Sequence, residues 1–311
     1  MKSNYIKIIV LFLLMEFSAN GIFAQQDAMY TQYMFNIQAI NPAYAGSKDA
    51  LSATLISRNQ WVGFEGAPNT TSFSVHTPLL GKLLGLGFSY VHDEIGPTKI
   101  SFINVDLSAR IKVNSNGYLA AGIKSGIDNQ EIKLSMLTPS QREEIYDKNY
   151  SSNFEPNFGV GLFYYTDRFY LGLSSPRVMR RDFISREGSM NHINETERHF
   201  YFNGGYVMDI NRNLKFKPSY MLKYVAGAPL SFDLTAAVML KEKVVAGVAV
   251  REGDSFGAVL QLRIAQQFWF GYAYDFTTSR LRNYNSGIHE VMVSFDLGLY
   301  KNGIVKSPRF F

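Results

Sequence analysis

Residues 103 to 113 read Ile-Asn-Val-Asp-Leu-Ser-Ala-Arg-Ile-Lys-Val. Apolar side chains alternate with polar or charged ones over the whole stretch. Because successive side chains of a β-strand point to opposite faces, the stretch predicts a strand with one apolar face and one polar face. The same alternation returns in residues 232–240, 258–264 and 291–297. The sequence therefore predicts an all-β protein.

The connections between such runs decide between a soluble sandwich and a barrel. Reading outward from 103–113 gives about fourteen strands, an even number, as bacterial outer-membrane barrels require. We predict them at residues 50–58, 69–77, 83–91, 99–113, 117–127, 154–165, 168–175, 198–208, 213–223, 230–240, 243–251, 256–265, 268–276 and 289–298. Every second connection is short, whereas the others include all the long ones, at residues 60–69, 128–153, 176–197 and 277–288. This asymmetry favours a transmembrane outer-membrane β-barrel of about 14 antiparallel strands, with short periplasmic turns and longer extracellular loops.

The start of the chain has the features of a secretory signal. Lys2 and Lys7 precede an apolar run, and the small residue Ala24 lies at the expected cleavage point. The chain has no cysteine, which excludes disulfides and a lipid-modified cysteine. Nothing after residue 24 approaches the roughly 18 apolar residues of a membrane helix. The expected organisation is a signal peptide at residues 1–24, an N-terminal periplasmic or plug segment at 25–49, a β-barrel at 50–298 and a C-terminal periplasmic tail at 299–311. Within the N-terminal segment we expect a short helix near residues 28–35.

No motif of the chain predicts catalysis. Residues 253–257, Gly-Asp-Ser-Phe-Gly, have the spacing of a nucleophile motif, but that motif needs a strand turning into a helix, whereas this stretch lies between two predicted strands. A hairpin turn explains it better. The five histidines have no zinc-binding spacing, and a solvated loop cluster explains His92-Asp93-Glu94. We expect no enzyme, no cofactor and no metal site, and a net charge of +5 spread along the chain does not indicate nucleic-acid binding.

The polar face of the predicted strands would line the lumen. Charges of both signs are expected there, namely Asp106, Arg110, Lys112, Arg263, Glu290 and Asp296. Mixed signs suit charge pairs that cross-link a closed barrel better than a single-sign ring that selects ions. A polar conduit stays possible, but we favour a cross-linked barrel partly plugged by residues 25–45.

The chain around the first strand is dense in Gly, Pro and aromatic residues. It contains Tyr-x-Gln-Tyr (30–33), Asn-Pro-Ala-x-x-Gly (41–46), Arg-x-Gln-Trp-x-Gly (58–63) and Gly-Ala-Pro-x-Thr (66–70), followed later by Gly85-x-Gly87, residues 93–97 and His289-Glu290. In this order the motifs resemble the PorP/SprF family of Bacteroidetes outer-membrane proteins. The main residues that carry the resemblance are Tyr30, Gln32, Tyr33, Asn41, Pro42, Ala43, Gly46, Arg58, Gln60, Trp61, Gly63, Gly66, Ala67, Pro68, Gly96 and Pro97.

The resemblance implies a function that composition and periodicity do not supply. It implies a non-enzymatic component of type IX secretion and gliding machinery in the cell outer membrane, which helps to secrete or anchor a surface adhesin. The implied partners are outer-membrane lipid, the C-terminal region of that secreted protein, a periplasmic peptidoglycan-associated protein and other type IX secretion components. A passive outer-membrane diffusion channel is the alternative, and a hydrolase using Ser255 is a third hypothesis.

The long loops are the candidate partner surfaces. Residues 128–153 and 176–197 mix charged with apolar side chains, as a protein-binding surface would. Their candidate contact residues are Arg142, Arg177, Arg180, Arg181 and Arg186. Arg58 and Trp61 could also anchor a partner. We favour the alternative, in which Arg58 pairs inside the barrel and Trp61 packs its loop against the rim.

Overall fold

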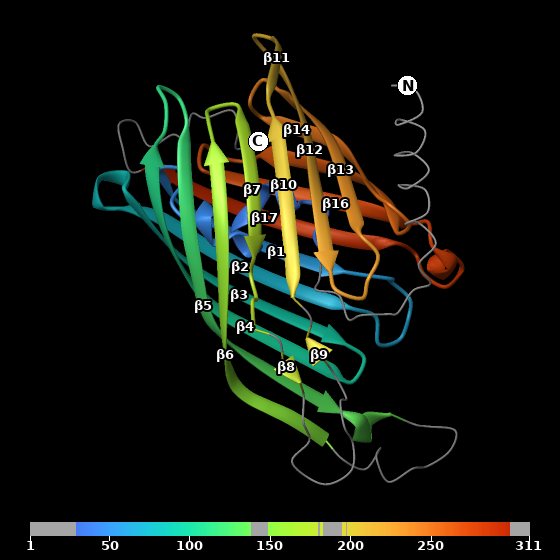
Figure 1. Cartoon of the computed structure of the whole chain (residues 1–311). Coiled ribbons are helices and arrows are strands. Elements are labelled where there is room, and N and C mark those ends of the chain that lie inside the picture. Colours follow the sequence, from blue (N-terminus) through green and yellow to red (C-terminus); the bar gives the residue numbers. More distant parts are fainter. Residues whose placement is uncertain (1–28, 138–148, 180, 183–194, 197, 299–311) are drawn as a thin grey trace, which may run out of the picture.

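The wall of the molecule is a closed barrel of fourteen antiparallel strands (Figure 1), as the alternation predicts. The computed structural model describes residues 29–137, 149–179, 181–182, 195–196 and 198–298. The wall strands are β1 (Ala50–Asn59), β2 (Asn69–Leu79), β3 (Leu84–Ile95), β4 (Thr98–Lys112), β5 (Tyr118–Lys133), β6 (Asn149–Tyr165), β7 (Phe169–Ser175), β10 (His199–Tyr206), β11 (Met208–Asn211), β12 (Leu214–Val225), β13 (Ser231–Leu240), β14 (Val244–Arg251), β15 (Ser255–Arg263), β16 (Phe268–Thr277) and β17 (Ile288–Gly298).

Each wall strand pairs with its neighbours in sequence, and the first strand closes on the last. β1 pairs with β17 from Ala50↔Gly298 to Asn59↔His289. β10 and β11 are two parts of one wall strand, because both pair with β12. A closed sheet satisfies the backbone groups that an open edge would leave exposed to lipid. β8 (Arg181–Asp182) and β9 (Glu195–Thr196) form a separate small hairpin.

The two faces of the wall are inverted relative to a soluble protein. In β4, Ile103, Val105 and Leu107 are exposed on the outside, whereas Asn104 and Asp106 are buried inside. This is the arrangement that lipid around a barrel requires, because the apolar face meets hydrocarbon and the polar groups find partners in the interior.

The expected lumen charges divide into two groups. Asp106, Arg110, Glu290 and Asp296 point inward and pair with other groups. Lys112 is instead exposed, and Arg263 is only half-buried, with its guanidinium 5.3 Å from the centre of the Trp269 ring. Both residues lie at the short-turn ends of their strands. The alternation of polar and apolar side chains therefore continues beyond the part of each strand that encloses the lumen.

The structure corrects two boundaries. β5 and β6 reach Lys133 and start at Asn149, so the loop expected at 128–153 is shorter. The pairing of β5 with β6 shifts register between Asp128 and Gln130, and such a bulge breaks the alternation that marks a strand. Within residues 28–35, where a helical turn is expected, lies the 3₁₀ turn η2 (Tyr33–Phe35), and it is followed by η3 (Ile37–Ala39) and η4 (Pro42–Tyr44). Further 3₁₀ turns are η5 (Leu80–Lys82), η6 (Leu134–Met136) and η8 (Arg280–Asn283). No helix of the described residues is long and apolar enough to cross a membrane.

Residues 29–48 lie inside the barrel, and we call them the lumen segment. Most of their side chains are buried, and Figure 1 shows their blue turns enclosed by the strands. Inward-facing glycines make room for them. A Cβ at Gly85 would lie 2.1 Å from the carbonyl oxygen of Ala45, and one at Gly122 would lie 2.4 Å from the nitrogen of Ala43. The wall is therefore shaped to fit this segment.

Gly122 and Ala121 are neighbours on β5 that test this fit. Replacing Gly122 with Ala puts a methyl group against the backbone of η4, so we expect a loss of about 1–3 kcal/mol of unfolding free energy. Ala121 faces outward, and Ala121→Val only enlarges the lipid-facing surface. Urea unfolding in lipid bilayers measures both variants. Equal stability of the two would contradict close packing between the segment and the wall.

Candidate functional site

The lumen segment crosses the whole interior. We call the two ends of the barrel the long-loop end and the short-turn end. Met29 contacts Ser231, the first residue of β13, at the long-loop end. Lys48 pairs with Asp296 near the end of β17, at the short-turn end, with 3.1 Å between Nζ and Oδ1. The segment therefore runs from the long-loop end to the short-turn end, where β1 begins.

A buried charge cluster holds the start of the segment to the wall. The Arg58 cluster consists of Arg58, Asp275, Glu290 and Thr31. Nη1 of Arg58 donates to Glu290 at 3.0 Å, to Asp275 at 3.1 Å and to the hydroxyl of Thr31 at 2.8 Å. Glu290 also accepts the backbone N–H groups of Thr31 and Gln32, both at 2.9 Å. Residues of three wall strands, β1, β16 and β17, thus bind two consecutive residues of the segment.

The cluster is closed to solvent, and this determines its energetics. The Arg58 side chain has no exposed surface, and Glu290 is 1% exposed. Two carboxylates face one guanidinium, and the N–H groups of the segment help to solvate the excess negative charge. A buried charge is costly without partners. The segment therefore stabilises the cluster by supplying partners, and the cluster in turn holds the segment in place.

The middle of the segment is held by side-chain amides. Nε2 of Gln38 donates to a carboxylate oxygen of Asp106 at 3.0 Å, and Asp106 pairs with Lys124 at 2.8 Å. Asn41 caps η4 by accepting from the N–H of Ala43 at 3.0 Å, and its amide donates to the carbonyl of Leu162 on β6. The opposite wall is therefore tied to the same segment.

The short-turn end of the segment is fixed by a second set of charges. The carboxylate of Asp49 pairs with Lys82 at 2.8 Å and with Arg110 at 2.6 Å. Burial raises the pKa of Asp49, but the hydrogen bonds and charges of Lys82 and Arg110 outweigh this and hold the pKa below its usual value. Gly46, at φ +74°, donates its N–H to Nδ1 of His76.

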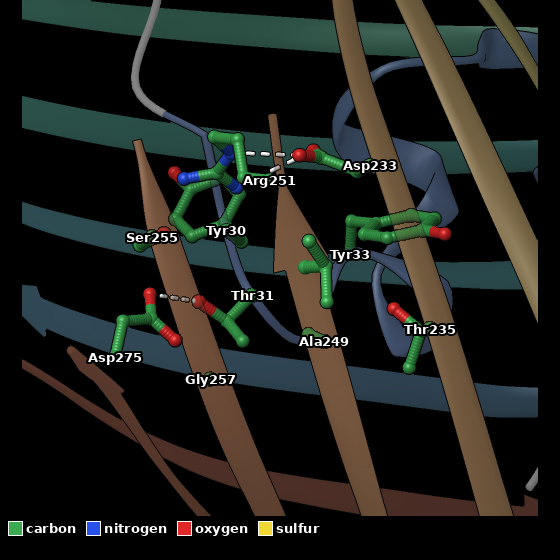
Figure 2. A pocket seen from close by; sticks show the side chains of 11 residues that line it. Tyr30, Thr31, Tyr33, Asp233, Thr235, Ala249, Arg251, Ser255, Gly257 and Asp275 are labelled. Carbon is green, nitrogen blue, oxygen red and sulfur yellow. Dashed lines mark hydrogen bonds and ion pairs between the residues drawn. The ribbon is translucent and has the colours of Figure 1, made fainter. Parts of the chain in front are cut away.

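A pocket lies between the segment and the wall near the long-loop end (Figure 2). Tyr30, Thr31 and Tyr33 line one side of it, and Asp233, Arg251 and Asp275 line the other. Arg251 pairs with Asp233 at 2.8 Å, and Asp275 belongs to the Arg58 cluster. The pocket is a seam along the segment, with its charges committed to neighbouring protein groups.

The remaining motif residues shape the rim at the long-loop end. Trp61 is half-buried with φ +46°, and Gln60 donates its N–H to the carbonyl of Pro68 across the loop. Gly66 accepts from the N–H of Gly96 at 2.9 Å, and a Cβ at Gly66 would lie 3.3 Å from Cα of Gly96. The other rim motif residues are Gly63, Ala67, Pro68 and Pro97. The bond between Gly66 and Gly96 joins two neighbouring loops of the rim.

The structure describes two of the five arginines that are expected to contact a partner. Arg177 is buried, with its guanidinium 4.4 Å from the centre of the Phe102 ring, so it does not present its charge to an external partner. The chain turns inward after β7, which the sequence pattern does not reveal. Arg181 lies in the small β8–β9 hairpin. Arg142, Arg180 and Arg186 lie outside the described residues.

The site contains residues that sequence reasoning missed. Asp275, Thr31 and Gln38 were not singled out, although the inward positions of β16 and the polar residues between the Tyr and Asn motifs were available signals. Ser255, weighed as a nucleophile, follows a tight turn in which Gly253 has φ +71°. No group of three or more His, Cys, Asp or Glu side chains within the described residues is placed to hold a metal ion.

Removal of Arg58 tests the cluster. Arg58→Ala leaves two buried carboxylates without their cation, so we expect a loss of about 3–5 kcal/mol of unfolding free energy. Arg168→Ala, which removes an exposed pair with Asp209, should cost roughly 0–1 kcal/mol. The triple variant Arg58→Met, Asp275→Asn, Glu290→Gln should recover part of the loss, because it removes the unpaired charges. Urea unfolding measures all three, and a small effect of Arg58→Ala would refute the role of the cluster.

Solved structures of three other proteins align with most of this chain. The channel described as "CymD monoaromatic hydrocarbon channel" aligns with a TM-score of 0.51 at 11% identity, over 88% of this chain and 94% of that one. A Pseudomonas aeruginosa FadL homologue aligns with a TM-score of 0.45 at 13% identity, over 89% and 95%. The Acinetobacter baumannii outer membrane protein Omp33 aligns with a TM-score of 0.48 at 8% identity, over 79% and 98%. No curated protein matches the chain.

One family profile matches most of the sequence. It is described as "Type IX secretion system membrane protein PorP/SprF", and the match covers residues 22–295. The match includes the lumen segment, the rim motifs and the wall strands up to β17. With the barrel fold it places the protein in the outer membrane. The chain belongs to the PorP/SprF family of type IX secretion system membrane proteins.

Proposed function

We propose that this protein is a non-enzymatic outer-membrane partner that helps to secrete or anchor a surface adhesin through the adhesin's C-terminal region. Family membership implies association with the membrane and with other secretion components. The observation that carries the proposal further is the filled lumen, tied to the wall at both ends and in the middle. A barrel filled in this way offers its rims to partners rather than a path through its centre.

The rim at the long-loop end has the composition of a binding surface. Phe64 and Tyr284 are exposed there, and Arg280 and Arg282 are exposed on the same loop as Tyr284. Aromatic and arginine side chains are enriched at the centres of protein interfaces. The loops that carry them are joined, because Val62 exchanges backbone hydrogen bonds with Ser286 and Gly287. A pre-ordered surface loses less conformational entropy on binding.

The opposite rim suits the proposed periplasmic contact. β11 and β12 form a hairpin that continues beyond the point where β7 stops pairing, at Tyr206↔Phe169. All four residues of β11 are exposed, including Met208 and Ile210. A peptidoglycan-associated protein or another secretion component could bind this projection.

A diffusion channel is the second candidate, because the CymD channel shares the barrel fold. A channel needs a continuous aqueous path, whereas the lumen segment here buries Gln32, Gln38 and Asn41 against the wall. The filled lumen therefore favours the anchoring proposal.

Deletion of residues 183–194 tests the anchoring proposal directly. This deletion spares Arg177, which is packed inside, and both strands of the small hairpin. The wild-type protein, purified in detergent from its native outer membrane, should retain a large secreted protein that mass spectrometry identifies, and the deletion should lose it. Ser115→Ala, an exposed position in a short turn at the opposite end of the barrel, is the control and should retain the secreted protein. A wild-type barrel that purifies without any secreted protein contradicts the proposal.

Conductance separates the two candidates. The wild-type protein in planar bilayers should show no steady ion current, since the segment occupies the lumen. The double variant Arg58→Ala, Asn41→Ala, which loosens two of the ties, should show intermittent openings. A steady current through the wild-type protein would support the channel instead.

A further inference from the structure

Four cations gather at the short-turn end of the second half of the barrel. Arg212 lies in the turn between β11 and β12, Lys241 and Lys243 lie in the turn between β13 and β14, and Arg263 ends β15. Backbone hydrogen bonds join these positions. The N–H of Lys241 donates to the carbonyl of Asn213 at 2.7 Å, and the N–H of Arg263 donates to the carbonyl of Lys243 at 2.8 Å. We call the four cations the basic turn cluster.

Neighbouring protein groups do not neutralise the basic turn cluster. Three of its members are exposed and Arg263 is half-buried, and none forms an ion pair with a residue that the structure describes. Glu242, the carboxylate of the same turn, pairs instead with Lys215, with 2.9 Å between Oε1 and Nζ. The cluster therefore presents uncompensated positive charge at the surface.

The opposite ends of the same hairpins are not basic. The connection at residues 226–230 between β12 and β13 contains no charged residue, and the turn at residues 252–254 between β14 and β15 reads Glu-Gly-Asp. The positive charge is therefore a property of the short-turn end of these strands and not of the strands as a whole.

The basic turn cluster begins where the lipid-facing surface ends. Leu240, directly before Lys241, is exposed on the outer face of the wall, and so is Leu262, directly before Arg263. Apolar side chains on the outer face of a barrel lie in hydrocarbon, because that face meets the lipid tails. Cations one residue further along the chain therefore lie at the depth of the lipid headgroups.

The turn between β13 and β14 carries its lysine in an unfavourable backbone conformation. The N–H of Lys243 donates to the carbonyl of Leu240 at 3.0 Å, and the two residues between them, Lys241 and Glu242, have φ of +50° and +56°. Asn and Gly are usual at such positions, because positive φ strains most L residues. Lys241 is exposed, so core packing does not account for a lysine there, and its charge is the property to explain.

We propose that the basic turn cluster binds anionic phospholipid headgroups in the periplasmic leaflet of the outer membrane. The short turns of an outer-membrane barrel face the periplasm, and lipid phosphates are the anions found at the depth of the cluster. Lysine and arginine side chains close to an anionic membrane surface are attracted to it. Lipid bound there fixes the depth of the neighbouring β11–β12 hairpin. This inference rests on the barrel and its orientation and is independent of the proposed adhesin.

Lipid selectivity in a bilayer tests the proposal. The purified full-length protein is reconstituted in phosphatidylcholine that contains a trace of spin-labelled phosphatidylglycerol or spin-labelled phosphatidylcholine. Electron paramagnetic resonance then measures the fraction of each probe that the protein surface immobilises. The test variant is Arg212→Gln, Lys241→Asn, Lys243→Gln, and Asn also suits the positive φ at position 241, so the turn is retained. The matched control, Arg280→Gln, Arg282→Gln, removes exposed cations at the long-loop end.

The wild-type protein should prefer phosphatidylglycerol over phosphatidylcholine by about twofold or more at low salt, and the preference should weaken at high salt because salt screens exposed charges. The test variant should lose most of this preference and the control should keep it. An equal preference in the wild-type protein and the test variant overturns the proposal, as does an equal loss in the control. A wild-type protein without lipid preference, whose test variant loses an acidic periplasmic protein on purification, would assign the cluster to a protein partner instead.

Discussion

The guanidinium of Arg58 joins the barrel wall to the chain inside it. It lies on β1, and its two carboxylate partners come from β16 and β17, so the cluster spans the seam at which the barrel closes. The same carboxylates bind Thr31 and Gln32 of the lumen segment. Because none of these charges reaches solvent, the wall and the segment depend on each other for their electrostatic balance.

The wall could be predicted from the sequence, whereas the path of the lumen segment could not. Strand positions follow from a period of two, as in residues 103–113, and short turns fix which strands are neighbours. The segment has no period, and its burial depends on amides such as Gln38 whose partners are far away in sequence. One local signal was present. Gly85 and Gly87 occupy inward positions of β3 where a barrel otherwise places polar side chains, and the structure fills that space with Ala45 and Gln38.

The arginines show the same limit at the level of single residues. Arg58 and Arg177 both stand at the long-loop ends of strands, and in sequence both are cations beside a long loop. Both side chains are buried, one between carboxylates and the other over the Phe102 ring. Whether such a residue binds a partner or the interior depends on the direction in which the loop leaves its strand. That direction is set by tertiary packing and not by composition.

A polar barrel interior is usually associated with transport, but here it has a structural cause. Lipid requires an apolar outer face, so the polar residues must face inward, and a narrow lumen leaves them without enough water to solvate their charges. The segment supplies the missing partners: Thr31 and Gln32 for Glu290, Gln38 for Asp106, and Lys48 for Asp296. The polar groups of the interior therefore serve to hold the barrel together. The parts of the protein that face its surroundings are therefore its two rims, and at the long-loop end the first loop is bonded to two others, through Gly66 to Gly96 and through Val62 to Ser286 and Gly287.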